Sequence, residues 1–242
     1  MKIFEYSSYG ITLILICIAI IHWIRNKILP WRDMGFIIDK KTLHDIMAAF
    51  IICGVAVSCI FTIDWFWDFI LIQEIKTPSD IFFKFILFLF IASFIEEFIN
   101  RGLLVNGLSV LLKKNWQIIA FAALFFGLGH ASGEGVTLLS IFSNAAGGAV
   151  YTIAFISSKN IWFPWALHFS WNTFQYIFGY PVSGFEIESV VVLTDIKNTI
   201  FNGGIYGPEG GLIGVFFRIV VLVMILLYVK CYRNVNIKTV FR

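Results

Sequence analysis

Seven long apolar segments recur along this chain of 242 residues, and each approaches the length that a helix needs to cross a lipid bilayer. A spanning helix takes about 20 mostly apolar residues, and all its backbone hydrogen bonds are satisfied within the segment. The sequence therefore predicts an all-α, polytopic transmembrane helix bundle with about seven spanning helices. These segments are residues 9–24, 43–63, 81–99, 116–131, 136–156, 161–180 and 211–229.

The composition excludes an ordinary soluble domain. Hydrophobic residues make up 59% of the chain and charged residues only 14%, whereas a soluble domain carries about 25% charged residues. The net charge of +3 is small and spread over the loops, so we expect the lipid bilayer as the partner and no nucleic acid. The four cysteines have no metal-binding spacing and are expected to be free thiols.

The chain divides into three parts. Residues 1–80 hold N-terminal helices, beginning with an uncleaved first span, and residues 81–180 hold a helical core. Residues 181–242 hold an extracytoplasmic, partly mobile loop, the last span and a basic tail. The segment 101–112 is too short to span alone, so it either continues the third span after a bend or forms a short re-entrant or interfacial helix.

Lysine and arginine alternate with acids from one connection to the next, which predicts the orientation. Basic residues gather in 25–42, 113–114, 159 and 230–242, whereas the intervening connections are acidic. Because short cytoplasmic loops carry the excess of Lys and Arg, we expect the N-terminus outside and the C-terminus in the cytoplasm. The chain is expected to be integral to a bacterial cell membrane, and its oligomeric state is left open.

Few ionisable residues interrupt the apolar segments. Each costs roughly 2.5–3.5 kcal/mol at the centre of a span, so each needs a reason. Lys84 and Arg218 lie near span ends, where a long side chain can reach the interface. Glu96, Glu97 and Arg101 are harder to explain in this way.

The spacing of these three residues separates the two acids. Residues four apart share a helix face, so Glu97 and Arg101 can form an ion pair. Glu96 points about 100° away from Glu97, which leaves its carboxylate free to act. The alternative is that the trio only packs helices together.

Two later spans carry further pairs at the same spacing, and in the first of them the Phe126 ring can pack against the His130 imidazole one turn away. Phe126 and His130 lie in FFGLGH, and His168 and Asn172 lie in HFSWN. Histidine and asparagine side chains can both donate hydrogen bonds, and two donors on one rigid face suit an oxyanion. Two histidines, an asparagine and a spare glutamate on three spans indicate a catalytic site.

This ordered set resembles the CPBP family of intramembrane proteases, the CAAX proteases and bacteriocin-processing enzymes, also called the Abi family. The family pattern EExxxR, FxxxH and HxxxN is present as Glu96-Glu97…Arg101, Phe126…His130 and His168…Asn172. The stretch GGAVYTIAFISSKNIWFPWALHFSWN matches the motifs that separate the last two. The likeness covers roughly residues 81–178.

The resemblance implies peptide-bond hydrolysis in a membrane-associated peptide or protein, without a covalent intermediate, at a site entered from the cytoplasm or laterally from lipid. By position, Glu96 and His130 would activate water, and His168 and Asn172 would hold the oxyanion. Glu97 and Arg101, with Phe126, would orient the site.

The cofactor is left open between none and a divalent metal such as zinc. Glu96, His130 and His168 could form a two-histidine, one-carboxylate metal site. No HExxH motif is present, however, and we favour direct activation of water by Glu96 and His130.

Two other classes of function stay open. The chain could be a non-catalytic membrane scaffold, immunity or sensor protein of the same fold that acts through partner binding. A proton-coupled transporter is less favoured, because no inverted repeat is visible. One geometric question also arises, since His130 lies about 24 Å along its helix from Lys114 and His168 only about 12 Å from Asn160.

Overall fold

All seven predicted segments are helical in a computed structural model, which describes residues 2–28, 30–132, 134–185, 189–194 and 197–242. Four helices are long and apolar enough to cross a membrane, over Tyr9–Asn26, Thr42–Phe66, Leu138–Ser158 and Leu212–Cys231. The chain is therefore an integral membrane protein, and the count of seven spans stays a prediction. The main helices are α1 (Lys2–Asn26), α3 (Thr42–Phe66), α4 (Asp80–Glu97), α5 (Val105–Leu111), α6 (Asn115–Gly129), α7 (Leu138–Ser158), α8 (Trp162–Ile177) and α9 (Leu212–Cys231).

The segment 101–112 is not a separate re-entrant or interfacial helix. A π-helical stretch, Phe98–Leu104, joins α4 directly to α5, so the helix runs without a break to Leu111. Its hydrogen bonds reach five residues back, as from the Val105 N–H to the Asn100 carbonyl. π-Helical turns of this kind occur frequently at functional sites.

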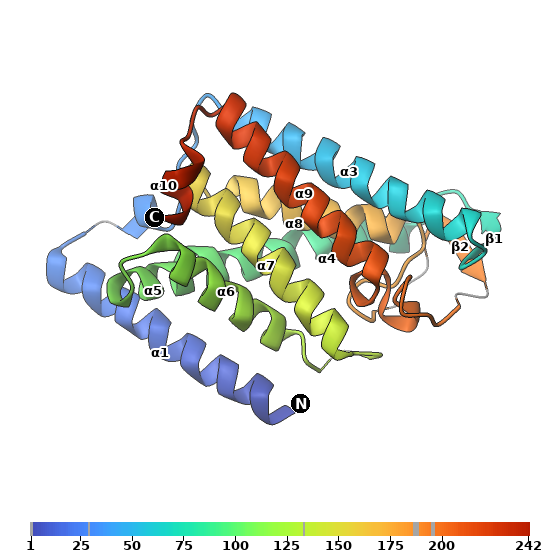
Figure 1. The fold of residues 1–242 in the computed structure, drawn as a ribbon, viewed down its shortest axis with the longest axis horizontal. Coiled ribbons are helices and arrows are strands. Elements are labelled where there is room, and N and C mark those ends of the chain that lie inside the picture. Colours follow the sequence, from blue (N-terminus) through green and yellow to red (C-terminus); the bar gives the residue numbers. More distant parts are fainter. Residues whose placement is uncertain (1, 29, 133, 186–188, 195–196) are drawn as a thin grey trace.

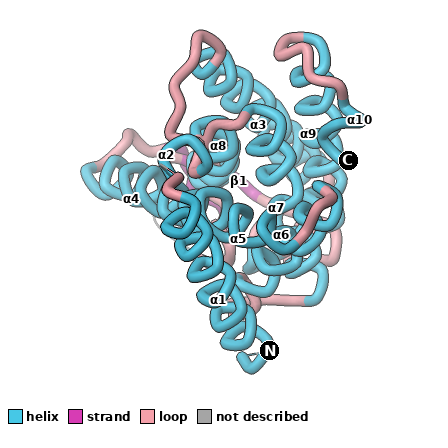
Figure 2. The backbone as a smooth tube through the Cα atoms, turned by 90° about the vertical axis from the view of Figure 1, so that its left-hand side faces the viewer, coloured by secondary structure: helices cyan, strands magenta, loops and turns pink. Residues whose placement is uncertain are grey.

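Helix α8 lies at the centre of the bundle, in contact with α3, α4 and α7 (Figure 1). Its buried residues are mainly aromatic and aliphatic, such as Phe163, Leu167 and Trp171, but they also include His168. At the periphery, α1 packs on α5 (Figure 2). Gly107 of α5 permits this contact, because a β-carbon there would overlap the Leu15 backbone.

Helix α7 begins and ends at well-defined caps. Thr137 and Ser140 form a reciprocal capping box at its start, which satisfies backbone donors that the first turn leaves free. Lys159 ends the helix in the left-handed conformation. The next residues lie inside the fold, where Ile161 donates its N–H to the Gly35 carbonyl and Asn160 is buried.

The sequence does not predict the small antiparallel sheet at one end of the bundle. Strand β1 (Leu71–Ile75) pairs with β2 (Val191–Thr194), which lies in the connection between α8 and α9. Two 3₁₀ turns follow, at Gly204–Tyr206 and Pro208–Gly210. Tyr206 and Glu209 of these turns are buried, so this part of the loop belongs to the core. The short helices α2 (Pro30–Asp33) and α10 (Ile237–Phe241) lie at the other end.

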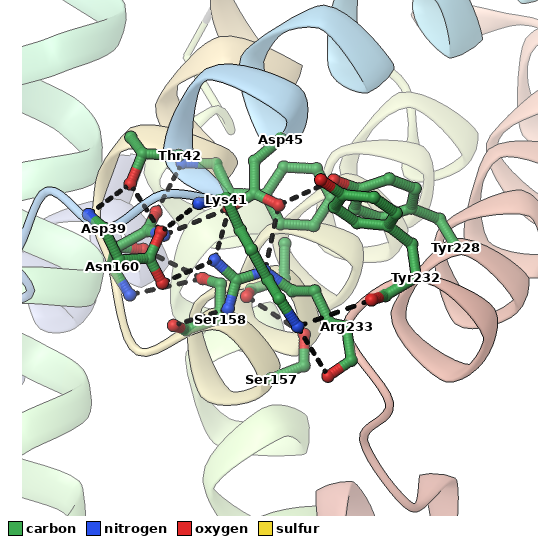
Figure 3. A network of polar contacts seen from close by, with 12 residues as sticks. Asp39, Lys41, Thr42, Asp45, Ser157, Ser158, Asn160, Tyr228, Tyr232 and Arg233 are labelled. Atoms are coloured by element: carbon green, nitrogen blue, oxygen red, sulfur yellow. Dashed lines mark hydrogen bonds and ion pairs between the residues drawn. The ribbon is translucent and has the colours of Figure 1, made fainter.

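A polar cluster closes that other end (Figure 3). Asp45, at the start of α3, accepts hydrogen bonds from Asn160, Tyr228 and Arg233. The Arg233 guanidinium also donates to the Ser158 carbonyl and to Asp39. We call Asp39, Asp45, Asn160, Tyr228 and Arg233 the basic-end cluster, because the connections rich in Lys and Arg lie at this end. The cluster joins α3, the α7–α8 turn and the tail.

Candidate active site

A cavity of about 350 Å³ lies between α4, α6, α7 and α8. Four residues that the sequence singles out for catalysis line it: Glu96, His130, His168 and Asn172. The bundle therefore brings the three motifs to one place, although the helices that carry them are far apart in sequence.

The ion pair between Glu97 and Arg101 lies behind this cavity and is fully buried. The distance from Arg101 Nη1 to Glu97 Oε1 is 3.0 Å, and Arg101 Nη2 donates to the Gly148 carbonyl at 2.8 Å. The Arg101 guanidinium also lies 4.9 Å from the centre of the Phe126 ring. These contacts fix the turn of the helix on which Glu96 is carried. Asn100 supports the same turn by donating to the Glu96 carbonyl at 2.8 Å.

The structure gives Glu97 a second partner that the spacing does not predict. His168 Nδ1 lies 2.9 Å from Glu97 Oε1, the oxygen that also accepts from Arg101. Since the carboxylate accepts, Nδ1 donates and Nε2 is left for other partners. The Tyr151 ring stacks on the imidazole at 5.0 Å between ring centres. His168 is thus held by a carboxylate at one edge and a ring on its face.

Glu96 lies beside His130 instead. The distance from Glu96 Oε2 to His130 Nε2 is 3.8 Å, and the Glu96 side chain is 41% exposed. His130 Nδ1 lies 2.8 Å from the Phe126 carbonyl. A carbonyl can only accept, so Nδ1 carries the proton and Nε2 of the neutral ring is an acceptor that faces Glu96. The two adjacent acids therefore serve different histidines.

Phe126 separates the two histidine rings. Its ring centre lies 4.7 Å from that of His130 and 5.7 Å from that of His168. The turn at Asn160 is buried, so α8 starts inside the fold. The histidines then face one cavity across the phenylalanine.

A shared metal site does not fit this arrangement. Both histidines hold Nδ1 against an acceptor and leave Nε2 free, as histidine ligands commonly do. Within the described part of the chain, however, no three His, Cys, Asp or Glu side chains lie close enough to hold one ion. Glu96, His130 and His168 as placed therefore do not form a zinc site.

Glu96 and His130 also line a second cavity, of about 340 Å³, on the side of α1. Thr12 of α1 and Asn100 of the π-helical stretch contribute to its wall. The Tyr9 hydroxyl donates to the Gly129 carbonyl at 3.2 Å, next to His130. The Glu96–His130 pair thus stands between two cavities, and Phe126 lines both.

Sequence reasoning missed a second buried ion pair at the same cavity. Arg218 of α9 does not reach the interface as predicted: it is buried, and its Nη2 lies 2.5 Å from Glu209 Oε1. The guanidinium lies over the Trp171 ring, and Trp171 Nε1 donates to Glu209 at 3.1 Å. Gly147 makes room, because a β-carbon there would overlap the guanidinium. The adjacent glycines 147 and 148 were the sequence feature that could have indicated a large side chain packed against α7.

Further polar groups complete this wall. Ser183 donates to Glu209 Oε2 at 2.6 Å, and Asn144 Nδ2 donates to the Tyr206 hydroxyl at 2.9 Å. Burial raises the pKa of Glu209, but Arg218 and the Ser183 hydroxyl more than offset it and hold the pKa below its ordinary value. Glu209 is therefore ionised beside Arg218. Asn144 lines the cavity as well.

Comparison with known proteins finds one similar family, over part of the chain. Residues 78–174 match the family model described as type II CAAX prenyl endopeptidase Rce1-like. The match spans α4 to α8 and includes every residue of the three motifs, but it ends before Glu209 and Arg218. No curated protein and no solved structure matches the chain. The region from 78 to 174, about two fifths of the chain, is therefore similar to the Rce1-like type II CAAX prenyl endopeptidases.

Proposed function

We propose that the chain is a glutamate-dependent intramembrane endopeptidase that hydrolyses a peptide bond in a membrane-associated peptide or protein. One observation carries the proposal: Glu96 Oε2 lies 3.8 Å from His130 Nε2, the ring nitrogen that does not contact the Phe126 carbonyl, on a cavity wall. That distance is too long for a direct hydrogen bond but suits two acceptors that share one water.

Water held in this way is prepared for attack. It donates one hydrogen to Glu96 and the other to His130, so an oxygen lone pair is left to face the substrate. General-base assistance of this kind contributes typically 10²–10⁴-fold to a rate. The Phe126 carbonyl fixes the His130 tautomer and keeps Nε2 as the acceptor.

The oxyanion that forms needs donors across the cavity. The Asn172 amide and His168 Nε2 are the candidates, one helical turn apart on α8. Donation from His168 Nε2 requires a proton on both ring nitrogens, because Nδ1 already donates to Glu97. The Asn172 amide donates in either state.

The proton balance closes without a covalent intermediate. The water oxygen bonds to the scissile carbonyl carbon as Glu96 or His130 takes its proton. The carbon–nitrogen bond then breaks, and the same proton passes to the departing amine. The other product is first a carboxylic acid, and it gives the second proton of the water to the released amine, so the products leave as a carboxylate and an ammonium.

The orientation belongs to the proposal too. We place the N-terminus outside and the C-terminus in the cytoplasm of a bacterial cell membrane, on the charge alternation of the connections. The contacts of Lys41 with the Tyr232 and Arg233 carbonyls support this, because they gather two of the basic segments at one end.

The test compares Glu96→Gln with the wild type in membranes. Peptides that change between the two membrane peptidomes identify candidate substrates, and their cleavage by purified protein is then measured. We expect a loss of about 10²-fold or more, with an unchanged unfolding temperature. Glu74→Gln is the matched control, since Glu74 is an exposed acid on β1. Undiminished cleavage by Glu96→Gln would refute the proposed role.

A further inference from the structure

The two ends of the bundle differ strongly in charge. Twelve of the eighteen Lys and Arg residues lie in the segments 25–41, 113–114, 159 and 230–242. Contacts between these segments place them at one end, as when Asn115 donates to the Thr239 carbonyl and Arg233 to the Ser158 carbonyl. The connections at the other end, 67–79, 130–137 and 178–211, hold only Lys76 and Lys197.

The cavity extends toward the end that is poor in Lys and Arg. His130 follows the last residue of α6, so the length of that helix separates it from Lys114. Ser183 and Phe185, from the connection between α8 and α9, line the cavity together with Glu209. None of the cavity-lining residues comes from the basic segments.

The exposed residues of the lining mark the mouth. Phe185 is 70% exposed and Phe88 of α4 is 58% exposed, whereas Tyr151, His168 and Arg218 are buried. The opening therefore lies between the first half of α4 and the segment 182–185, and the buried end carries His168. Glu96, which is 41% exposed, and His130 lie on the wall that this cavity shares with the one beside α1.

We propose that the cavity opens in the extracytoplasmic half of the membrane and admits an exported polypeptide segment in an unfolded state. This rests on the proposed function and on the rule that Lys- and Arg-rich connections stay in the cytoplasm. It departs from the cytoplasmic entry that the family resemblance implies and retains lateral entry from lipid.

The cavity also limits the chemistry of the substrate. Its volume of about 350 Å³ is at the small end for binding sites, so it holds a few residues of extended chain and excludes a folded domain. The approach is apolar, through Phe85, Phe88 and Leu89, and the polar groups lie beyond it. The substrate is thus a secreted peptide or an outer juxtamembrane segment with apolar residues at the cut.

Thiol labelling tests the opening independently of catalysis. In a background without Cys17, Cys53, Cys59 and Cys231, single cysteines are introduced as Phe185→Cys at the mouth, Trp67→Cys at the same end and Lys113→Cys at the basic end. Protoplasts are treated with a membrane-impermeant methanethiosulfonate. We expect Phe185→Cys and Trp67→Cys to react in intact protoplasts, and Lys113→Cys only after permeabilisation.

Two labelling results would overturn the proposal. The reverse pattern would place the mouth in the cytoplasm. In the second result, the reagent labels Trp67→Cys in intact protoplasts but does not label Phe185→Cys either before or after permeabilisation. That result would show that the orientation is right but that the mouth is not open at Phe185.

The substrate is tested separately, by locating the cuts that disappear in Glu96→Gln membranes. Cuts in exported or outer segments support the proposal, and cuts in cytoplasmic tails overturn it. Absence of any Glu96-dependent cut defeats the proposed protease function, whereas the labelling result still decides where the cavity opens.

Discussion

The basic-end cluster and the cluster of Glu97, Arg101 and His168 are each built around a buried acid and an arginine, and they differ in how completely their atoms are paired. In the basic-end cluster, both Asp45 carboxylate oxygens accept hydrogen bonds and all three Arg233 guanidinium nitrogens donate them. In the cluster of Glu97, Arg101 and His168, Glu97 Oε1 accepts twice. Glu97 Oε2 and Arg101 Nε have no protein partner among the described residues.

We expect this difference between a cluster that only stabilises the fold and one that takes part in the proposed reaction. A buried ion pair stabilises a fold only when its remaining hydrogen-bonding groups are satisfied. The basic-end cluster meets that condition and joins three segments of the chain. The Glu97 cluster does not meet that condition, and it lies beside the cavity that holds the candidate catalytic groups. Incomplete pairing is what we expect where water and substrate take part.

The largest effect should come from Asp45→Ala. It leaves Arg233 without its main partner at a buried site, which costs about 3–5 kcal/mol of unfolding free energy. Thermal or denaturant unfolding in detergent measures it, with Glu74→Ala as the exposed control. Cleavage per folded molecule should stay unchanged. If the variant cleaves less per folded molecule than the wild type, the basic-end cluster also affects catalysis, and the distinction between the two clusters is wrong.

Glu97→Gln, in contrast, should lower the rate of cleavage more than the stability of the fold. The amide keeps an oxygen toward His168 but removes the charge that Arg101 and His168 share, so cleavage should fall about 10–100-fold, as for other residues that orient a ligand or base. Cleavage assays normalised to folded protein give the result. If only the unfolding temperature changes, the Glu97 cluster is as purely structural as the other. Glu97→Ala should lower the yield of folded protein more than Glu96→Ala does.

A smaller effect is expected at the second wall of the cavity. Glu209→Gln weakens the contacts to Trp171 and Arg218, which pack next to Asn172 and Tyr151, so cleavage should fall about tenfold through a lower kcat. Steady-state kinetics separates kcat from KM. A change confined to KM would assign Glu209 to substrate binding and not to the positioning of α8.

The smallest effect concerns acid stability at the basic end. Burial raises the pKa of Asp39, but hydrogen bonds from Thr42 and Lys41 and the charge of Arg233 bring it below the ordinary value. Because the folded pKa is depressed, the stabilisation is present above the unfolded pKa and is lost as pH falls through the folded pKa.

This half-exposed pair is worth less than about 1 kcal/mol. Asp39→Asn should therefore have a slightly lower melting temperature than the wild type near neutral pH, and the difference should vanish in acid. A difference that persists in acid would assign the effect to lost hydrogen bonds and not to charge.

The helical fold could be predicted from the sequence because lipid-spanning segments must be long, apolar and internally hydrogen-bonded. All seven predicted segments fall on helices. The β1–β2 pair could not be predicted, because Leu71 and Thr194 are far apart in the sequence and no local sequence pattern indicates that they pair. The π-helical stretch was also missed, because it has the same apolar composition as the α-helix around it.

The candidate site was predictable to the extent that it depends on local spacing. The spacing of four residues anticipated the contact of Glu97 with Arg101 and the packing of Phe126 on His130. It said nothing of the bond from His168 to Glu97, which depends on how two helices cross. Arg218 was misread for the same reason, since position along a span does not tell which way a side chain points.

The π-helical stretch Phe98–Leu104 has a consequence for how such a helix could arise. An α-helix turns 100° per residue, and a stretch bonded five residues back shifts the angular phase of everything after it. Before the shift the helix presents Glu96 to the cavity, and after it the helix presents Gly107 to α1. A one-codon insertion or deletion in this stretch would turn one of these faces away. The angular phase of the helix, and not only its residues, therefore determines both which side chain faces the cavity and which face contacts α1.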